Sequence, residues 1–145
     1  MENSLSILQE LEQTGKYVFH GSGSHIEIFE PRQAHNHING VDVPDGEPAI
    51  FASSKLNYAI FMAIINKKNC PNGYRSSSNG REFKATKETL EQLTSNASGY
   101  VHVFNASDFK ERISGEEECV RHESIKPLYM YEVHVSEMQF PIIEL

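Results

Sequence analysis

The first hydrophobic pattern along the chain is that of an amphipathic helix. Leucines recur at every third position between residues 5 and 11, among Gln and Glu. This spacing predicts a helix over residues 4–14 that packs one face against the rest of the protein and ends at Gly15. Residues 86–94 predict a second, shorter helix.

A stronger apolar stretch begins near Lys55, where Ser53 or Ser54 can cap a helix. A helix that is apolar around most of its circumference is buried on both sides, so we expect this one at the centre of the fold. Its apolar residues fall on two stripes, the first with Leu56, Ala59, Ile60 and Ala63, the second with Tyr58, Phe61, Met62 and Ile65.

Short runs of β-branched and aromatic residues predict strands. Residues 17–20 form such a run, and it leads into Gly21-Ser22-Gly23-Ser24, which indicates a buried strand that opens into a flexible loop. Further strands are predicted at 49–52, 100–104, 119–122 and 128–135.

Two segments have no sustained period. Residues 29–48 contain three prolines and two glycines, which predicts a long surface loop that covers or shapes a binding site as a flap. Residues 66–80 are rich in Asn, Ser, Gly and Lys and predict a connector.

The predicted helices lie mostly early in the chain and the strands mostly late, which favours an α+β fold over regular βαβ alternation. A chain of 145 residues has the usual size of one domain, here 1–145. Gly21-Ser22-Gly23 lacks the later glycine and the helix of a dinucleotide fingerprint, so a Rossmann site is excluded.

Charge and composition limit the classes of partner that this chain can bind. The chain has 13 Lys and Arg against 20 Asp and Glu, a net charge of −7, without a dense basic run. Duplex nucleic acid bound through a basic patch is therefore excluded, whereas a small anionic ligand is not.

The longest apolar run, 58–65, is too short for a membrane span, and no signal peptide is recognisable. We expect a cytoplasmic protein, although secretion without a signal leaves the same sequence. Cys70 and Cys119 are expected to be free thiols.

Three segments carry a resemblance to a known family. They are Phe19-His20-Gly21-Ser22, then residues 49–63 beginning Ala-Ile-Phe-Ala-Ser-Ser-Lys, and then residues 118–128 beginning Glu-Cys-Val-Arg-His. In this order and spacing the chain resembles ADP-ribosyltransferases of the His-Tyr-Glu branch, which includes poly-ADP-ribose polymerases, diphtheria-type toxins and rifampin-modifying enzymes. The resemblance covers roughly residues 17 to 135. It implies split antiparallel sheets with flanking helices around a cleft for NAD.

The resemblance also implies roles for particular residues. Cleavage of the nicotinamide–ribose bond needs a grip on the carboxamide, an aromatic slab and a carboxylate near the ribose. Gly21 lets backbone groups approach the carboxamide, Ser22 adds a hydrogen bond, and the imidazole of His20 binds a ribose hydroxyl. Tyr58 or Phe61 stacks on the pyridinium ring. Glu118 stabilises the positive charge that develops on the ribose.

Two assignments stay open: the aromatic residue that stacks, Tyr58 or Phe61, and the carboxylate. Four glutamates lie near the expected start of the strand at 119–122, namely Glu116, Glu117, Glu118 and Glu123. We favour Glu118 because it directly precedes the apolar residues. Ile50 stands where the polymerase-like sequences carry a tyrosine.

We therefore expect a toxin-like transferase that takes NAD as its substrate and transfers ADP-ribose to a protein, nucleic acid or small-molecule acceptor, or to water. The alternatives are a binding module that recognises ADP-ribose or a nucleotide without turnover, and an effector-like interaction domain with a vestigial cleft. None of these involves a membrane.

Other combinations of reactive residues are weaker. His35 and His37, with Asp42 and Asp45 nearby, have no third nitrogen ligand at a recognisable spacing, so a metal site is not expected there. Cys119 and His122 lack a third group to orient them as a nucleophile pair.

Overall fold

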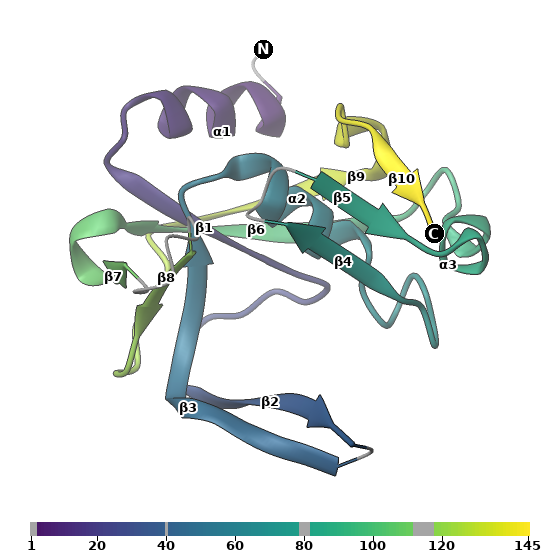
Figure 1. Cartoon of the computed structure of the whole chain (residues 1–145). Coiled ribbons are helices and arrows are strands. Elements are labelled where there is room, and N and C mark those ends of the chain that lie inside the picture. Colours follow the sequence, from purple (N-terminus) through teal and green to yellow (C-terminus); the bar gives the residue numbers. More distant parts are fainter. Residues whose placement is uncertain (1–2, 40, 79–81, 112–117) are drawn as a thin grey trace.

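The chain forms two sheets with its most apolar helix between them, as the computed structural model shows (Figure 1). The structure describes residues 3–39, 41–78, 82–111 and 118–145. The larger sheet is antiparallel, and the smaller sheet has one parallel pair, β10 with β5. The predicted α+β class is confirmed.

In the larger sheet two strands from the early part of the chain, β3 and β1, lie side by side between strands from the later part. The strand order is β7 (Lys110–Glu111), β8 (Glu118–Arg121), β3 (Val41–Ser53), β1 (Tyr17–Ser22), β6 (Ser98–Asn105) and β9 (Tyr129–His134), with β2 (Arg32–Ile38) paired to β3. The smaller sheet runs β10 (Ile142–Glu144), β5 (Glu82–Ala85) and β4 (Arg75–Ser78). The helices are α1 (Ser4–Gln13), α2 (Leu56–Ile64) and α3 (Lys87–Gln92), with 3₁₀ turns η1 (Ala106–Asp108) and η2 (Val135–Glu137).

Helix α2 lies at the centre because both of its apolar stripes are covered. The first stripe packs with Leu8 of α1 and Val101 of β6 against the larger sheet. The second packs with Phe83 of β5 and, at its edge, Phe140. The two-stripe prediction is therefore confirmed. The predicted serine cap is wrong in detail: the carboxylate of Glu12, on α1, accepts the Leu56 N–H at 2.7 Å and satisfies the start of α2.

The prediction of a loop over residues 29–48 is wrong. This segment forms most of a hairpin of β2 and the first part of β3, which extends from the body of the protein (Figure 1). Ile38 pairs with Val41, and Asn39, which follows Ile38, has φ of +52°. An Asn-Gly pair between two extended runs is a strong hairpin signal, which the prolines of the segment obscured.

The small sheet was also not predicted. The expected connector 66–80 contains β4, and strands β5 and β10 follow later, so strands occur throughout the chain and not mainly late. These strands have only three or four residues each, too few for a periodic pattern. Phe83 on β5 and Ile142 on β10 pack with the second stripe of α2.

Two sequence expectations concern single features. Neither Cys70, which is buried, nor Cys119, which is half-buried, is in a disulfide. Among the helices described, none has the length and apolar character needed to cross a membrane.

Candidate functional site

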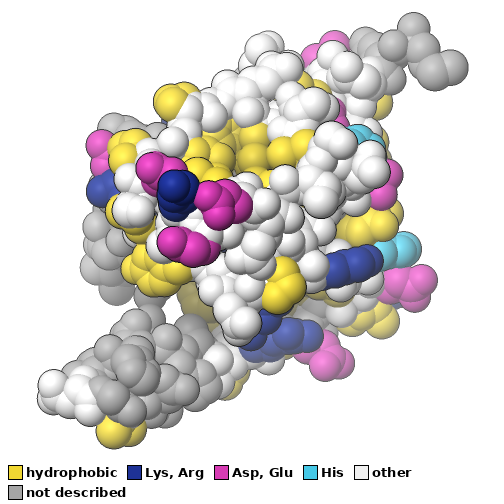
Figure 2. Space-filling model, turned by 90° about the vertical axis from the view of Figure 1, so that its right-hand side faces the viewer, with side chains coloured by type: hydrophobic (Ala, Val, Ile, Leu, Met, Phe, Trp, Pro, Cys, Tyr) yellow, Lys and Arg dark blue, Asp and Glu magenta, His cyan; other side chains and the backbone are white. Residues whose placement is uncertain are grey.

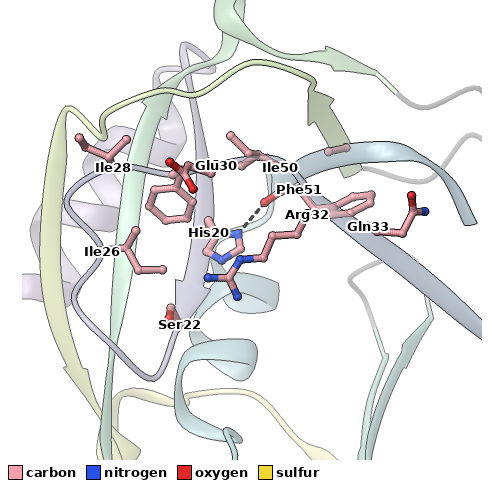
Figure 3. Close-up of a pocket in the computed structure, with 11 residues that line it drawn as sticks. His20, Ser22, Ile26, Ile28, Glu30, Arg32, Gln33, Ile50 and Phe51 are labelled. Atoms are coloured by element: carbon pink, nitrogen blue, oxygen red, sulfur yellow. Dashed lines mark hydrogen bonds between the residues drawn. The ribbon is translucent and has the colours of Figure 1, made fainter. Parts of the chain in front are cut away.

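The larger sheet opens between β1 and β3. Strand β1 pairs with β6 along its whole length, but its pairing with β3 consists of Phe19 opposite Ser53. Past Phe19 the two strands separate, and the side chain of His20 bridges them, with Nδ1 2.6 Å from the carbonyl oxygen of Phe51 (Figure 3). The strand predicted at 17–20 and the strand predicted at 49–52 thus lie side by side. Two cavities flank this opening.

The smaller one, the Glu118 cavity, has a volume of about 60 Å³. It brings together His20, Gly21, Tyr58 and Glu118, four of the residues predicted from the sequence. The register explains how: Glu118 lies opposite Ser53, and Ser53 lies opposite Phe19. The remaining wall is apolar and consists of Phe19, Phe51, Ala52 and Met62. Among the described residues that line this cavity, one carries a carboxylate and none is a lysine or arginine.

The second, the His20 cavity, has a volume of about 280 Å³ (Figure 3). Ser22 lies at one end of it, and Arg32 and Glu30 bring opposite charges to its wall. Apolar lining comes from Ile26, Ile28, Phe29, Ala49 and Ile50, and Gln33 adds an amide. The base of the β2–β3 hairpin thus shapes the site, although the hairpin itself is not the loop that the sequence predicted.

His20 is held as a neutral imidazole. Burial lowers its pKa below the ordinary 6.5, the hydrogen bond to Phe51 opposes this, and the positive charges of Arg32 and Arg75 lower the pKa further. A carbonyl oxygen only accepts hydrogen bonds, so Nδ1 carries the proton and donates it to Phe51. In the neutral ring Nε2 is then an acceptor, ready for a hydroxyl group.

His102 is a second buried histidine that the sequence analysis did not single out. It pairs with His20 across β1 and β6, is fully buried, and accepts the Ile26 N–H on Nε2 at 3.0 Å. The ring of Phe29 packs edge-on against both histidines, with centroids 4.9 Å from each. Burial lowers the pKa of His102 to about 4; the proximity of the titratable rings of His20 and His25 also lowers it, and the backbone of His20 opposes the shift. Strand alternation alone would have placed His102 on the face shared by Tyr100 and Phe104.

The two aromatic candidates for stacking are separated by the structure. Tyr58 lines the Glu118 cavity and is half-buried. Phe61 has no exposed surface, and its ring centroid lies 5.0 Å from that of Phe83, on the side of α2 that faces the small sheet. Phe61 is therefore a core residue and does not reach the cleft, which corrects its place among the candidate binding residues.

Gly21 is required by packing. A Cβ at this position would lie 1.9 Å from the carbonyl oxygen of Ala59, because β1 runs directly against the backbone of α2. The same holds for Gly99 on β6, where an added Cβ would lie 2.0 Å from the carbonyl oxygen of Ala63. The sequence analysis explained Gly21 by its approach to a ligand, whereas the structure supplies a reason within the fold. Gly21 nevertheless lines the Glu118 cavity.

The remaining candidates lie elsewhere. Glu116 and Glu117 are outside the described residues. Glu123 is exposed in a bend after β8, where its backbone carbonyl accepts a hydrogen bond from Arg121 Nε at 3.1 Å. Glu118 is thus the candidate carboxylate that the structure places in a cavity.

The structure describes the residues of the weaker combinations only in part. His35 and His37 lie on β2, and their side chains, like those of Asp42 and Asp45, are outside the description. No group of three or more His, Cys, Asp or Glu residues suited to a metal occurs among the described residues. His122 is exposed, with Nδ1 3.0 Å from the carbonyl oxygen of Pro48.

Comparison with known proteins adds no assignment: no family model, curated protein or solved structure matches this chain significantly.

Proposed function

We propose that this protein binds NAD and cleaves the bond between nicotinamide and ribose, passing ADP-ribose to an acceptor or to water, within an ADP-ribosyltransferase-like fold. The observation that carries the proposal is the Glu118 cavity. Four residues chosen from distant parts of the sequence, His20, Gly21, Tyr58 and Glu118, line the same small space.

The charge and shape of this cavity suit the nicotinamide end of NAD. The pyridinium ring is flat and positively charged, and the cavity offers apolar walls, the ring of Tyr58 and one carboxylate. A cation enters such a space more readily than an anion. A planar ring also fits a narrow opening between two separating strands.

The reaction then follows from the positions of the side chains. When the C1′–N bond breaks, its electron pair goes to the nicotinamide nitrogen, which leaves as neutral nicotinamide, and positive charge develops on the ribose. The carboxylate of Glu118 stabilises that charge and orients the 2′-hydroxyl, which raises the rate because the interaction strengthens as the charge grows. An acceptor oxygen or nitrogen forms the new bond to C1′ and loses its proton.

His20 positions the ribose. Its Nε2 accepts a hydrogen bond from a ribose hydroxyl, since Nδ1 is already committed to Phe51. The neutral state matters, because an imidazolium would place a positive charge beside the one that develops on the ribose. The adjoining His20 cavity, with its apolar lining and the amide of Gln33, gives the adenosine portion a place to bind.

Incubation of the purified chain with NAD, with free nicotinamide measured by chromatography, tests the proposal. Time-dependent release that falls with His20→Ala is the expected result. A matched control is His134→Ala, an exposed histidine on β9 that faces neither cavity. Absence of both NAD binding and nicotinamide release would overturn the proposal.

A binding module without turnover is the second candidate, and Ile50 is the observation that favours it. This residue is 3% exposed and lines the His20 cavity at a position where the polymerase-like sequences carry a tyrosine. Without this tyrosine one aromatic contact to the ligand is missing, and the ligand is held less firmly for reaction. Saturable NAD binding without nicotinamide release would select this candidate.

A further inference from the structure

A third cavity lies on the other side of Ser22. It has a volume of about 490 Å³ and is formed by the loop after β1, the start of β2, the C-terminal end of α2 and the segment that leads to β4. It shares Ser22 and Arg32 with the His20 cavity, and Gly21 and Met62 with the Glu118 cavity. The three cavities are therefore adjacent to one another around the end of β1.

This third space, the basic cavity, collects positive charge. Arg32, Lys67 and Arg75 line it, and none of the described residues in its wall carries a carboxylate. The accumulation runs against the net charge of −7 for the whole chain. On the face of the protein drawn in Figure 2, Lys and Arg side chains lie in the lower part, with Asp and Glu side chains beside them.

Arg75 is fixed in place by the end of α2. Its Nη1 donates to the carbonyl oxygens of Met62, at 3.2 Å, and of Ile65. These carbonyls belong to the negative end of the helix dipole, which holds the guanidinium without pairing it to a carboxylate. Burial lowers the pKa of Arg75, but an arginine stays charged at neutral pH. An anion in the cavity would be met by the other donors of the same guanidinium.

The backbone on the opposite wall is fixed as well. A Cβ at Gly23 would lie 2.8 Å from Cγ of Asn66. Asn66 itself donates to the carbonyl oxygen of Ala63 at 2.8 Å and accepts the Asn69 N–H at 2.8 Å. The glycine-rich loop thus packs on a rigid helix end and can bring its backbone close to a ligand.

We propose that the basic cavity is a subsite for a phosphoryl group. Three cations, a hydroxyl and a close glycine backbone are the chemistry that binds phosphate oxygens. Because the basic cavity lies next to the other two cavities, a phosphoryl group bound there is near a ribose bound beside His20. Its source is either the diphosphate of NAD or a phosphate on the acceptor. Only this choice of source rests on the proposed function; the subsite itself does not.

Calorimetric titration with inorganic pyrophosphate tests the subsite directly. Lys67→Gln is the informative variant because Lys67 is exposed and its loss leaves the core intact, and Lys68→Gln removes the same charge one residue further along, outside the cavity wall. We expect Lys67→Gln to weaken pyrophosphate binding roughly three- to tenfold and Lys68→Gln less than twofold, since a charged hydrogen bond contributes more than a distant charge. Arg32→Gln should weaken binding similarly.

Competition with NAD distinguishes the two sources. If pyrophosphate displaces NAD, and Lys67→Gln weakens binding of NAD but not of nicotinamide riboside, the subsite holds the diphosphate of NAD. If pyrophosphate and NAD bind together, it holds a phosphate of the acceptor. Pyrophosphate binding in the absence of any NAD binding supports the subsite and overturns the proposed function. No pyrophosphate binding, or equal loss in the Lys67 and Lys68 variants, overturns the subsite.

Discussion

The Glu118 cavity and the basic cavity meet at Gly21 but have opposite character. The first is small and apolar, with Glu118 as its charged side chain, and the second is about eight times larger, with Arg32, Lys67 and Arg75. NAD has a positive ring at one end and a negative diphosphate further along. The separation of charge in the protein therefore matches a separation of charge in one ligand.

What keeps the two regions different is the end of β1. His20 faces the opening between β1 and β3, whereas Gly21 lies against α2 and Ser22 continues toward the basic cavity. Because His20 and His102 are neutral, neither of them adds a positive charge near the Glu118 cavity. Gly21 lines both the Glu118 cavity and the basic cavity, so a single residue of β1 borders two different electrostatic environments.

The largest effect is expected at Glu118. Glu118→Gln keeps the shape and removes the negative charge, so nicotinamide release should fall about 10²- to 10³-fold in kcat while NAD binding is retained. Rate measurements at saturating NAD check this. Glu123→Gln, in the exposed bend, is the matched control and should keep its activity. Loss in the Glu123 variant with full activity in the Glu118 variant would show that the reaction does not occur in the Glu118 cavity.

Acidification should lower the stability of the protein, because the neutral form of His102 is the one that the fold accommodates. Folding lowers the pKa of His102 from 6.5 to about 4, so the unfolded chain binds the proton more readily between these values. The free energy of unfolding therefore falls as the pH drops from 6.5 to 4, by roughly 3 kcal/mol at about 1.4 kcal/mol per pH unit. Urea unfolding across this range should show a smaller pH dependence in His102→Gln, which keeps a side-chain acceptor for the Ile26 N–H. An unchanged pH dependence would contradict the neutral assignment.

The next prediction distinguishes the role of Gly21 in packing from its role in NAD binding. Gly21→Ala should lower the free energy of unfolding by about 1–3 kcal/mol, because the added Cβ meets the backbone of α2. Gly99→Ala makes an equivalent clash away from the cavities and should cost a similar amount. Only Gly21→Ala should also weaken NAD binding, measured on the folded fraction. Equal NAD affinity in both variants would restrict Gly21 to its role in packing.

The smallest effect concerns the aromatic wall of the Glu118 cavity. Tyr58→Leu removes the ring that faces the pyridinium and should weaken NAD binding about three- to tenfold, as expected for loss of one cation–π contact. Phe61→Leu should lower stability by about 1–2 kcal/mol and leave NAD affinity unchanged, since Phe61 packs against Phe83. Equilibrium dialysis with NAD compares them. A weaker affinity in the Phe61 variant alone would show that our assignment of Tyr58 is wrong.

The sequence determined the elements whose patterns are local. The two stripes of α2, the helix at 4–14, the strand that begins at Tyr17 and the α+β class all follow from hydrophobic spacing, which burial enforces along each element. The predicted end of that strand at His20 is wrong, because β1 continues through Ser22 and pairs with β6 there. The prediction of Glu118 also depended on local order, because that glutamate begins an apolar strand.

Tertiary structure alone decided which of these residues meet. Pairing of β8 with β3 and of β3 with β1 carries Glu118 to His20, and no spacing within one segment encodes that register. The orientation of Phe61 toward the small sheet, the reason for Gly21 and the burial of His102 likewise depend on residues distant in sequence. Arg32, Lys67 and Arg75 form a basic cavity although they are scattered through an acidic chain, because electrostatic environments are set by distance in space.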